Sequence, residues 1–533
     1  MKHSRLALLG AVAAAVSLVV TGCSGTPSSD GTAPSASKPE SVVVAVGAVP
    51  DSLTPSPWGG SASHVVLSGL GSQLMAYKGA GSEESCLKPS TDLTGRLAES
   101  AELNPDGTGV IVKLRDLTSQ WGNKLSAEDV AWSLQIGMVR QPVMKGTLTT
   151  SGFDVDNLTK IIDEHTIQLN TKVVTSYTLA SLQNNLFYIH DSVEAKKHAT
   201  ADDPTANDWL SKNLADYSGW DLEEFTPGTS LTLKADSHWE GKRGSVKRVV
   251  IKAVSNTATR SQLVESGEAQ VAGSFEYDQY ASLAKAPGVQ VLDCVGQTRD
   301  TLMINTKTGP LADPAVRRAV SQAIDRAALV KGAYSGYGEP SKAIFPGVKA
   351  TPSYTFDKAA AKKALADAGY PDGFDMELSY SVTRPGPVAE RSAVLIQSML
   401  KDVGIRVALK NIASTTDFST AVIDGRYQAI LYSEPIVIND PAFYSYAFYA
   451  GGAPSNSTGW ADPRFDEARL KMADVKTSEA DRKTLLQDAA DYIDEGSPIL
   501  ALVQTKNMLA RQKGLTGANP LTNNQIYFAA LGG

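Results

Sequence analysis

The sequence predicts an α/β protein with more than one domain. Short runs of β-branched residues alternate along the chain with helical segments that carry capping residues. About 490 residues follow the first 40, and this is more than one hydrophobic core usually supports. The 533 residues show no internal repeat. We therefore expect two or three α/β domains, each with its own core.

Four strands are predicted from apolar runs. Residues 42–46 (VVVAV) and 249–254 (VVIKAV) have the composition of buried strands. Residues 231–235 (LTLKA) alternate apolar and polar side chains, as a half-exposed strand does. Residues 405–409 (IRVAL) follow a glycine that ends a predicted helix.

Three helices are predicted from capping residues. Asp357 is the expected N-cap of a helix over residues 358–368. A second helix is expected over about residues 389–403. A third is expected over residues 313–331, with Pro314 in its first turn.

The first 23 residues predict export. Lys2 and Arg5 precede an apolar run over residues 6–20, which is too short to span a bilayer comfortably and has the flanks of a secretory signal. The sequence VTGC that ends at Cys23 resembles the lipobox of bacterial lipoproteins. That resemblance implies cleavage before Cys23, a diacylglycerol on its thiol, and a protein held at the outer face of the cell membrane. The alternative is an ordinary signal peptide with a chance cysteine.

The segment after the leader is predicted to be a flexible linker. Residues 23–40 consist mainly of Ser, Gly, Thr, Pro and Ala, with too little apolar surface to offset the entropy of ordering. No later stretch has 18 consecutive apolar residues, so a soluble body is expected to follow the linker.

The charge argues against nucleic acid as a partner. The complete chain has a formal net charge of −7, and removal of Lys2 and Arg5 with the leader leaves 48 basic and 57 acidic residues, a net of −9. Phosphate binding requires basic clusters. The main basic grouping, which lies within residues 242–248, is expected on a solvated face.

Two cysteines remain once Cys23 carries lipid. Outside the cell Cys86 and Cys294 could form a disulfide. They could equally be buried free thiols, because sequence does not measure their separation.

Several motifs point to one family when they are taken together. They are LAES at 97–100, NPDGT at 104–108 with VKLR at 112–115, SAEDVAWSL at 126–134, INT at 304–306 with DPAVRRAVSQAIDR at 313–326, and AGYPDG at 368–373. In type and order they resemble motifs of extracellular solute-binding proteins of the peptide/nickel class. Within the third motif, Ser126 is the expected N-cap of a helix, because Glu128 and Asp129 follow in its first turn.

The resemblance implies a two-lobed periplasmic-binding-protein-like fold with an additional inserted domain. Its implied function is to capture a small-molecule ligand between the lobes and deliver it to the permease and ATPase subunits of an ABC transporter. It implies a monomer that is not an enzyme and needs no cofactor. The expected division is a signal peptide (1–22), a linker (23–40), lobe 1 in three pieces (41–75, 187–295 and 503–533), an inserted domain (76–186) and lobe 2 (296–502).

Arg384 is the expected partner of a ligand carboxylate. It lies in SVTRPGP, between a predicted strand and a predicted helix. Dipeptide binders of the family have Arg-Pro at the matching place, which implies that the Arg384 guanidinium pairs with the peptide carboxylate through its planar fork. The alternative is a surface arginine in a loop.

The other end of the ligand is less constrained. Peptide binders of the family hold the ligand's ammonium group with an Asp, but residues 436–438 at the matching place are Ile, Val and Ile. Glu434 could substitute for that Asp, whereas Asp440 is expected to cap the helix that follows. Tyr432 stands where the family has an aromatic residue. An α-amino group on the ligand therefore remains an open question.

Aromatic side chains are expected to complete the ligand site. Trp58, Tyr432, Tyr444 and Trp460 can cover peptide side chains or stack on sugar rings. A small peptide is the predicted ligand. An oligosaccharide, or a peptide-sensing lipoprotein without a transport role, is the alternative.

Enzymatic and metal-binding functions find little support in the sequence. Ser282 and Lys285 form an S-x-x-K pattern and residues 307–309 a K-T-G pattern, but they are too close in sequence to enclose a penicillin-binding domain. The six histidines form no metal-ligand pattern, so no metal site is predicted. A metal held as a chelate stays open.

Overall fold

Most strands of the protein belong to one 11-stranded sheet with the order β15-β14-β16-β12-β17-β11-β1-β10-β9-β8, in which β13 pairs with β17 off this path. The computed structural model describes residues 39–54, 62–239, 241–382, 386–434, 438–453, 456–520 and 526–532. The predicted signal peptide, the lipidation site Cys23 and most of the predicted linker lie outside these residues. We use lobe 1 for the part of the sheet from β11 to β8, and lobe 2 for the part from β15 to β16.

Lobe 1 contains three of the predicted strands side by side. Its strands are β1 (Ser41–Val46), β8 (Trp220–Thr226), β9 (Ser230–Ala235), β10 (Arg248–Ala253) and β11 (Val271–Ala272). β1 lies between β10 and β11 and is parallel to both, and β9 pairs antiparallel with β10. Val42 and Val249 are fully buried, as expected for central strands. Helices α7 (Thr257–Ser266) and α8 (Tyr277–Leu283) pack near β17.

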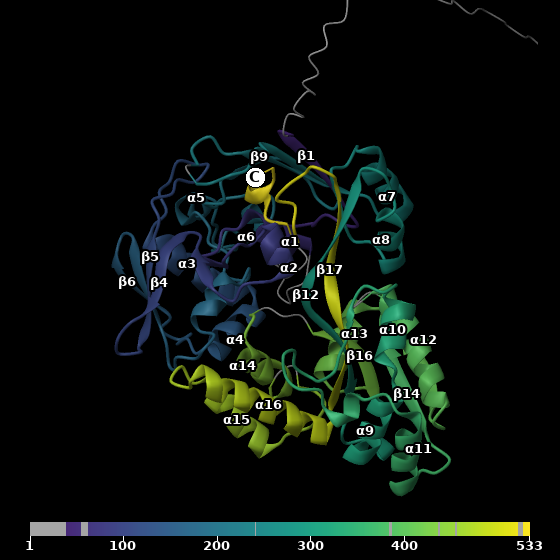
Figure 1. Cartoon of the computed structure of the whole chain (residues 1–533). Helices are drawn as coiled ribbons and strands as arrows, with labels where there is room; N and C mark the ends of the chain where they lie inside the picture. The colour runs from purple at the N-terminus through teal and green to yellow at the C-terminus, as the bar shows by residue number, and fades with distance from the viewer. Residues whose placement is uncertain are drawn as a thin grey trace, which may run out of the picture. The chain divides into compact units, whose positions relative to one another are not determined.

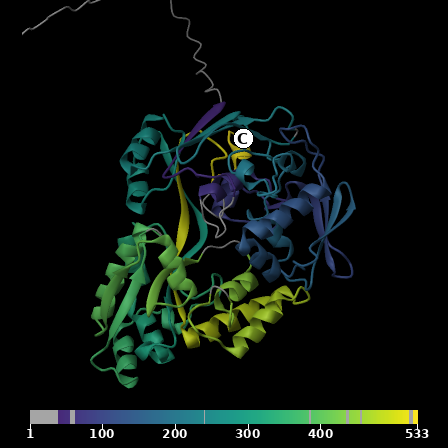
Figure 2. The same ribbon diagram turned by 180° about the vertical axis from the view of Figure 1, so that it is seen from behind.

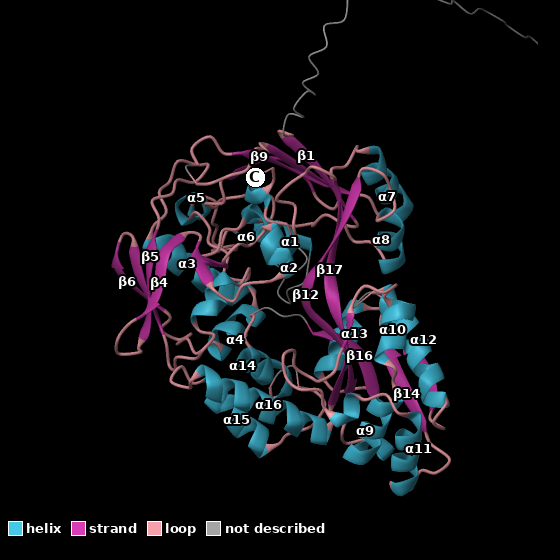
Figure 3. Ribbon diagram, in the orientation of Figure 1, coloured by secondary structure: helices cyan, strands magenta, loops and turns pink. Residues whose placement is uncertain are grey.

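Lobe 2 confirms the predicted helices around residues 357–403. β14 (Asp375–Tyr380) lies between the parallel strands β15 (Arg406–Asn411) and β16 (Ala429–Glu434). Helices α11 (Lys358–Asp367) and α12 (Pro387–Lys401) belong to the same lobe, and α12 packs against β14 and β15 (Figure 3). The Asp357 carboxylate accepts hydrogen bonds from the backbone amides of Ala359 and Ala360, each at 2.9 Å, so it is the predicted N-cap.

The single helix predicted over residues 313–331 is wrong. The structure has two helices, α9 (Pro314–Ala323) and α10 (Arg326–Ala333). The chain is extended at Ile324, and the Asp325 side chain caps α10 by accepting from the Ala328 amide at 3.0 Å. The buried Arg326 stabilises the break, because its guanidinium donates to the carbonyl oxygens of Ser321, Ile324 and Ala501.

Two long antiparallel strands, β12 (Val289–Ile304) and β17 (Ile499–Gln512), join the lobes (Figures 1 and 2). Leu292 and Leu509 belong to the core of lobe 1, whereas Leu302 and Leu500 belong to the core of lobe 2. The pairing of β12 with β17 shifts register between Val295 and Arg299 and again between Asp300 and Thr301. The boundaries predicted at 295/296 and 502/503 therefore fall inside paired strands, where the lobes meet without a linker.

A separate four-stranded sheet lies within the segment predicted as an inserted domain. Its order is β4 (Ala98–Leu103), β5 (Gly109–Leu114), β7 (Thr166–Asn170) and β6 (Thr159–Asp163). Helix α3 (Ala127–Arg140) begins with the predicted cap, since Ser126 and Asp129 form a capping box. Leu134 and Met144, the latter in α4 (Pro142–Thr150), belong to the core of this sheet.

The chain also contains the following α-helices and strands. They are α1 (Ala62–Leu70), β2 (Met75–Tyr77), α2 (Glu83–Leu87), β3 (Leu93–Gly95), α5 (Ser192–Lys196), α6 (Asn207–Leu210), β13 (Glu339–Pro340), α13 (Thr415–Ile423), α14 (Pro441–Tyr444), α15 (Pro463–Ala473) and α16 (Glu479–Gly496). Within the described part of the chain, no helix has the length and apolar character needed to cross a bilayer.

A disulfide attaches the start of the inserted segment to lobe 1. Cys86 in α2 is bonded to Cys294 in β12, and their Cα atoms are 4.6 Å apart. Both cysteines belong to the core of lobe 1, although Cys86 lies inside the range 76–186 predicted for the inserted domain. Nearby, Glu83 forms an ion pair of 2.7 Å with the buried Arg511 of β17. The chain around α2 thus packs with lobe 1.

Candidate functional site

A cavity of about 280 Å³ lies where the two lobes meet along β12 and β17. Lobe 1 lines it with residues 274–277 and Tyr280, and β17 with residues 505–508. Lobe 2 lines it with Ser433 and residues 386–388, and β12 contributes Thr298 and Asp300. The volume is near the lower end of the range for small-molecule sites, roughly 300–1,000 Å³. A ligand here would contact both lobes at once, which is the arrangement needed to couple binding to closure.

The cavity contains one buried carboxylate, Asp300, which is 6% exposed. Its Oδ2 accepts a hydrogen bond of 2.6 Å from the Tyr334 hydroxyl, and its Oδ1 accepts one from the Ser433 hydroxyl. Burial raises the pKa of Asp300 above its usual value, and the two hydroxyl donors oppose that rise. Tyr277, which also lines the cavity, packs against Tyr334 with ring centroids 5.2 Å apart.

The other charged groups at the cavity are paired. Glu276, at the N-cap of α8, forms an ion pair of 2.9 Å with Arg391 of α12, and this contact crosses from lobe 1 to lobe 2. Lys506 of β17 forms an ion pair of 2.9 Å with Glu339. Among the residues that the structure describes, no basic side chain forms an ion pair with Asp300.

Glu434, predicted to bind a ligand ammonium group, is instead a core residue with 0% exposure. Its cross-strand neighbour is Arg299 of β12, and the two side chains form an ion pair of 3.3 Å. Both Glu434 carboxylate oxygens accept from the Tyr449 hydroxyl at 3.0 Å. Burial raises the pKa of Glu434, and Arg299 opposes the rise. In this arrangement a partner distant in sequence satisfies the Glu434 carboxylate inside lobe 2, which sequence alone does not show.

The predicted ligand aromatics of lobe 2 also belong to its core. Tyr444 is buried, and the Arg299 guanidinium lies 5.2 Å from its ring centroid; its contact with ligand stays a prediction. Tyr432 and Trp460 are partly exposed and pack against the same core, Tyr432 beside Phe418 and Trp460 beside Phe465. Neither lines the cavity, and their contact with ligand stays a prediction.

Arg384 and Trp58 lie outside the described residues. The chain next to Arg384 is described, however, and Gly386, Pro387 and Val388 all line the cavity. These residues form the N-cap and first turn of α12. Residues 386–388, which follow Arg384 closely in sequence, therefore form part of the cavity wall.

Asp440 is the helix cap that the sequence predicts, and it also contacts the inserted segment. It accepts from the amides of Ala442 and Phe443 at the start of α14. Its Oδ2 also accepts from the Ser176 hydroxyl at 3.0 Å. Next to it, the Asn439 amide donates to the Tyr77 hydroxyl at 2.8 Å. Asn439 and Asp440 thus both connect lobe 2 to the inserted segment by hydrogen bonds.

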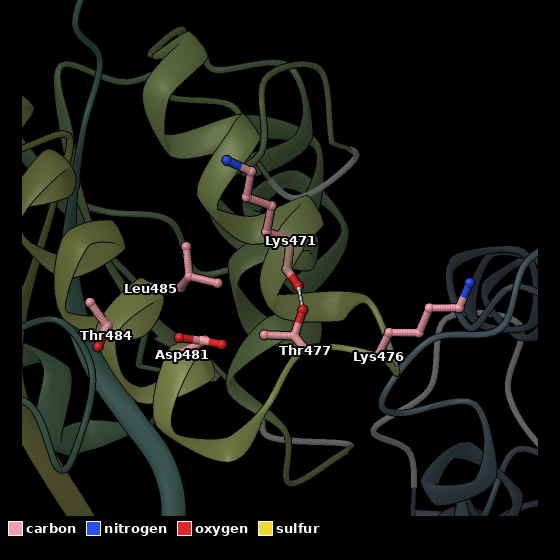
Figure 4. Close-up of a pocket in the computed structure, with 6 residues that line it drawn as sticks. All are labelled: Lys471, Lys476, Thr477, Asp481, Thr484 and Leu485. Carbon is pink, nitrogen blue, oxygen red and sulfur yellow. Dashed lines mark hydrogen bonds between the residues drawn. The ribbon is translucent and has the colours of Figure 1, made fainter.

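A second hollow, of about 470 Å³, lies between the end of α15 and the first half of α16 (Figure 4). Its lining residues all fall within 471–485. The Thr477 hydroxyl donates to the Lys471 carbonyl at 2.6 Å, and Asp481 accepts from Ser478, the cap of α16. This hollow is a feature of one helix pair and joins no two lobes, so the cavity along β12 and β17 is the candidate site.

Asp300 is the site residue that the sequence reasoning missed. The available signal was the charged pair Arg299-Asp300, which stands shortly before the apolar residues Leu302 to Ile304 of the same strand. The described residues contain no group of three His, Cys, Asp or Glu side chains able to hold a metal ion.

Residues 92–456 match the family model of the bacterial extracellular solute-binding proteins, family 5 (middle region). Among curated relatives, the glutathione-binding protein GsiB of Salmonella paratyphi A is 28% identical over 297 residues, which are 53% of this chain and 57% of that protein. The chain thus spans little more than half the length of that relative. The probable D,D-dipeptide-binding periplasmic protein DdpA of Escherichia coli is 26% identical over 454 residues, 84% of each chain.

Solved structures show the same fold. The periplasmic binding protein DppA from Helicobacter pylori, in complex with the peptide STSA, superposes with a TM-score of 0.76 at 21% identity over 92% of this chain and 97% of that chain. The murein tripeptide binding protein MppA of Escherichia coli superposes with a TM-score of 0.74 at 18% identity, over 92% of this chain and 98% of that one. The fold is therefore the two-lobed α/β fold of periplasmic binding proteins, as predicted.

Proposed function

The chain belongs to the bacterial extracellular solute-binding proteins, family 5, and on that basis we propose that it captures a small peptide in the cavity between its lobes and delivers it to the permease and ATPase of an ABC importer. The observation that carries the proposal is the cavity itself, since it is lined from both lobes along the strands that join them. The names of relatives with peptide ligands, glutathione and D,D-dipeptides, support a peptide.

The membrane attachment is part of the same proposal. The VTGC sequence ending at Cys23 supports a lipid anchor, and residues 23–40 support a flexible linker between anchor and body. Such an anchor would keep the captured ligand close to a membrane permease without a membrane-spanning helix. We propose a monomer at the outer face of the cell membrane.

Arg384 is proposed as the partner of the peptide carboxylate, because residues 386–388 line the cavity. Arg384→Ala should weaken binding of a dipeptide such as Met-Leu by about 1.5–3 kcal/mol, the scale of a hydrogen bond to a charged group. Isothermal titration calorimetry would measure this loss.

The matched control is Arg406→Ala, which removes a surface arginine of the same lobe that pairs with Asp375. It should leave dipeptide affinity unchanged. Equal affinities for the wild type and Arg384→Ala would contradict the role of Arg384 while leaving peptide capture standing.

A further inference from the structure

Strand geometry directs two neighbouring charges of β12 to opposite faces of the sheet. Arg299 pairs across the strands with Glu434, and Asp300 pairs with Ser433. Successive side chains of a strand alternate between faces. Arg299 and Glu434 accordingly meet in the core of lobe 2, whereas Asp300 and Ser433 both line the cavity. The position of Asp300 at the cavity wall thus follows from the pairing register.

Among the described residues that line the cavity, the charges do not balance. Glu276 is paired with Arg391 and Lys506 with Glu339, so these four groups cancel. Asp300 is held only by the neutral hydroxyls of Tyr334 and Ser433 within the described residues. A buried carboxylate without a cation is costly, because neutral hydrogen bonds replace only part of its lost hydration. Next to Asp300, the cavity therefore favours a cationic ligand group over an anionic or an apolar one.

We propose that Asp300 is the anchor for an organic cation of the ligand, an ammonium or guanidinium group. This inference rests on the proposed function and deepens it by naming the charged group that the ligand must carry. An ammonium group can donate to a carboxylate oxygen that already accepts one hydroxyl, since each oxygen has two lone pairs. The aromatic ring of Tyr277, which lines the same cavity, adds a favourable face for a cation.

Residues 436–438 carry no acid that could hold a ligand ammonium group, and Asp300 would supply that acid. Asp300 lies on β12, whereas residues 436–438 come after β16 in the sequence. The cation could be the amino terminus of a peptide or a Lys or Arg side chain, and the test separates these two sources.

Four probes should be titrated by calorimetry into the wild type and Asp300→Asn. They are Met-Leu, N-acetyl-Met-Leu, N-acetyl-Met-Lys and agmatine. Asp300→Asn should weaken every cationic probe that binds the wild type by at least about 10-fold, the lower end expected for a hydrogen bond to a charged group. Binding of N-acetyl-Met-Leu should not change. Preference for Met-Leu would identify the amino terminus as the cation, and preference for N-acetyl-Met-Lys would identify a side chain.

The matched control is Asp293→Asn, which removes an exposed carboxylate from the same strand and should leave all affinities unchanged. Equal affinity of the cationic probes for the wild type and Asp300→Asn would overturn the proposal. So would a wild type that binds N-acetyl-Met-Leu as tightly as both cationic dipeptides, and this comparison needs no variant that might fold poorly.

Peptide capture and the Asp300 anchor can be rejected separately. Agmatine binding that depends on Asp300, without binding of any dipeptide, would support the anchor and reject peptide capture. Equal affinities for the cationic dipeptides and N-acetyl-Met-Leu would support peptide capture and reject the anchor. Failure of all four probes to bind the wild type at millimolar concentration would reject both.

Discussion

Glu434→Ala should destabilise the protein by about 3–5 kcal/mol, the cost typical of removing one partner of a buried ion pair. The substitution leaves Arg299, which is 2% exposed, with an uncompensated charge inside lobe 2. It also removes the acceptor of the Tyr449 hydroxyl. Urea denaturation followed by circular dichroism would measure the change in the free energy of unfolding.

Two further variants test the cause of this loss. Glu467→Ala breaks an exposed pair with Lys471 on α15 and should leave the urea midpoint unchanged. Arg299→Met combined with Glu434→Leu removes both charges and should recover part of the stability, because no unpaired charge stays buried. If Glu434→Ala is as mild as Glu467→Ala, the pair does not stabilise lobe 2 as the structure indicates.

Loss of the disulfide is the second large effect that we expect. Cys86 and Cys294 are 208 residues apart in sequence, so their bond closes a long loop and restricts the unfolded chain strongly. Replacing both by Ser should lower the free energy of unfolding by about 2–5 kcal/mol. The same urea titration, with and without a reducing agent, would measure it.

The reducing agent supplies the internal control. It should lower the stability of the wild type to that of the double Ser variant and leave the variant unaffected. A wild type whose unfolding is indifferent to reductant, and equal to the variant, would show that the bond does not form or does not restrict the unfolded chain.

Local signals in the sequence were enough to predict much of the fold. Asp357, Ser126 and Asp440 each cap the helix expected of them, because a cap depends on residues within one turn. The break between α9 and α10 could not be predicted in the same way. It depends on Arg326, whose guanidinium donates to a carbonyl of β17, a strand far along the chain.

The candidate site was harder to predict for the same physical reason. The role of a charged residue depends on its partners, and the partners of Glu434 and Asp300 come from other elements. Arg299 on β12 satisfies Glu434, so a carboxylate that sequence placed at the ligand is buried in lobe 2. The role of Asp300 could not be predicted from sequence, because its cavity forms only where β12 meets residues of β17 and α12.

The two strands that join the lobes give a physical reason why ligand binding could be coupled to closure of the lobes. The register of β12 against β17 shifts twice beside Asp300, so local irregularity and the buried carboxylate coincide where the lobes meet. A ligand bound there would contact both lobes, and contacts made only when the lobes are together are what a ligand needs to favour a closed state.

Thermal unfolding of the purified protein against pooled di- to pentapeptides, with oligosaccharide pools in parallel, tests the central claim most directly. A ligand present at 100 times its dissociation constant should add about 2.7 kcal/mol to the stability of the folded protein. Peptide capture predicts a clear upward shift of the melting temperature with peptides and none with oligosaccharides. A shift with oligosaccharides alone, or no shift with either, would contradict it.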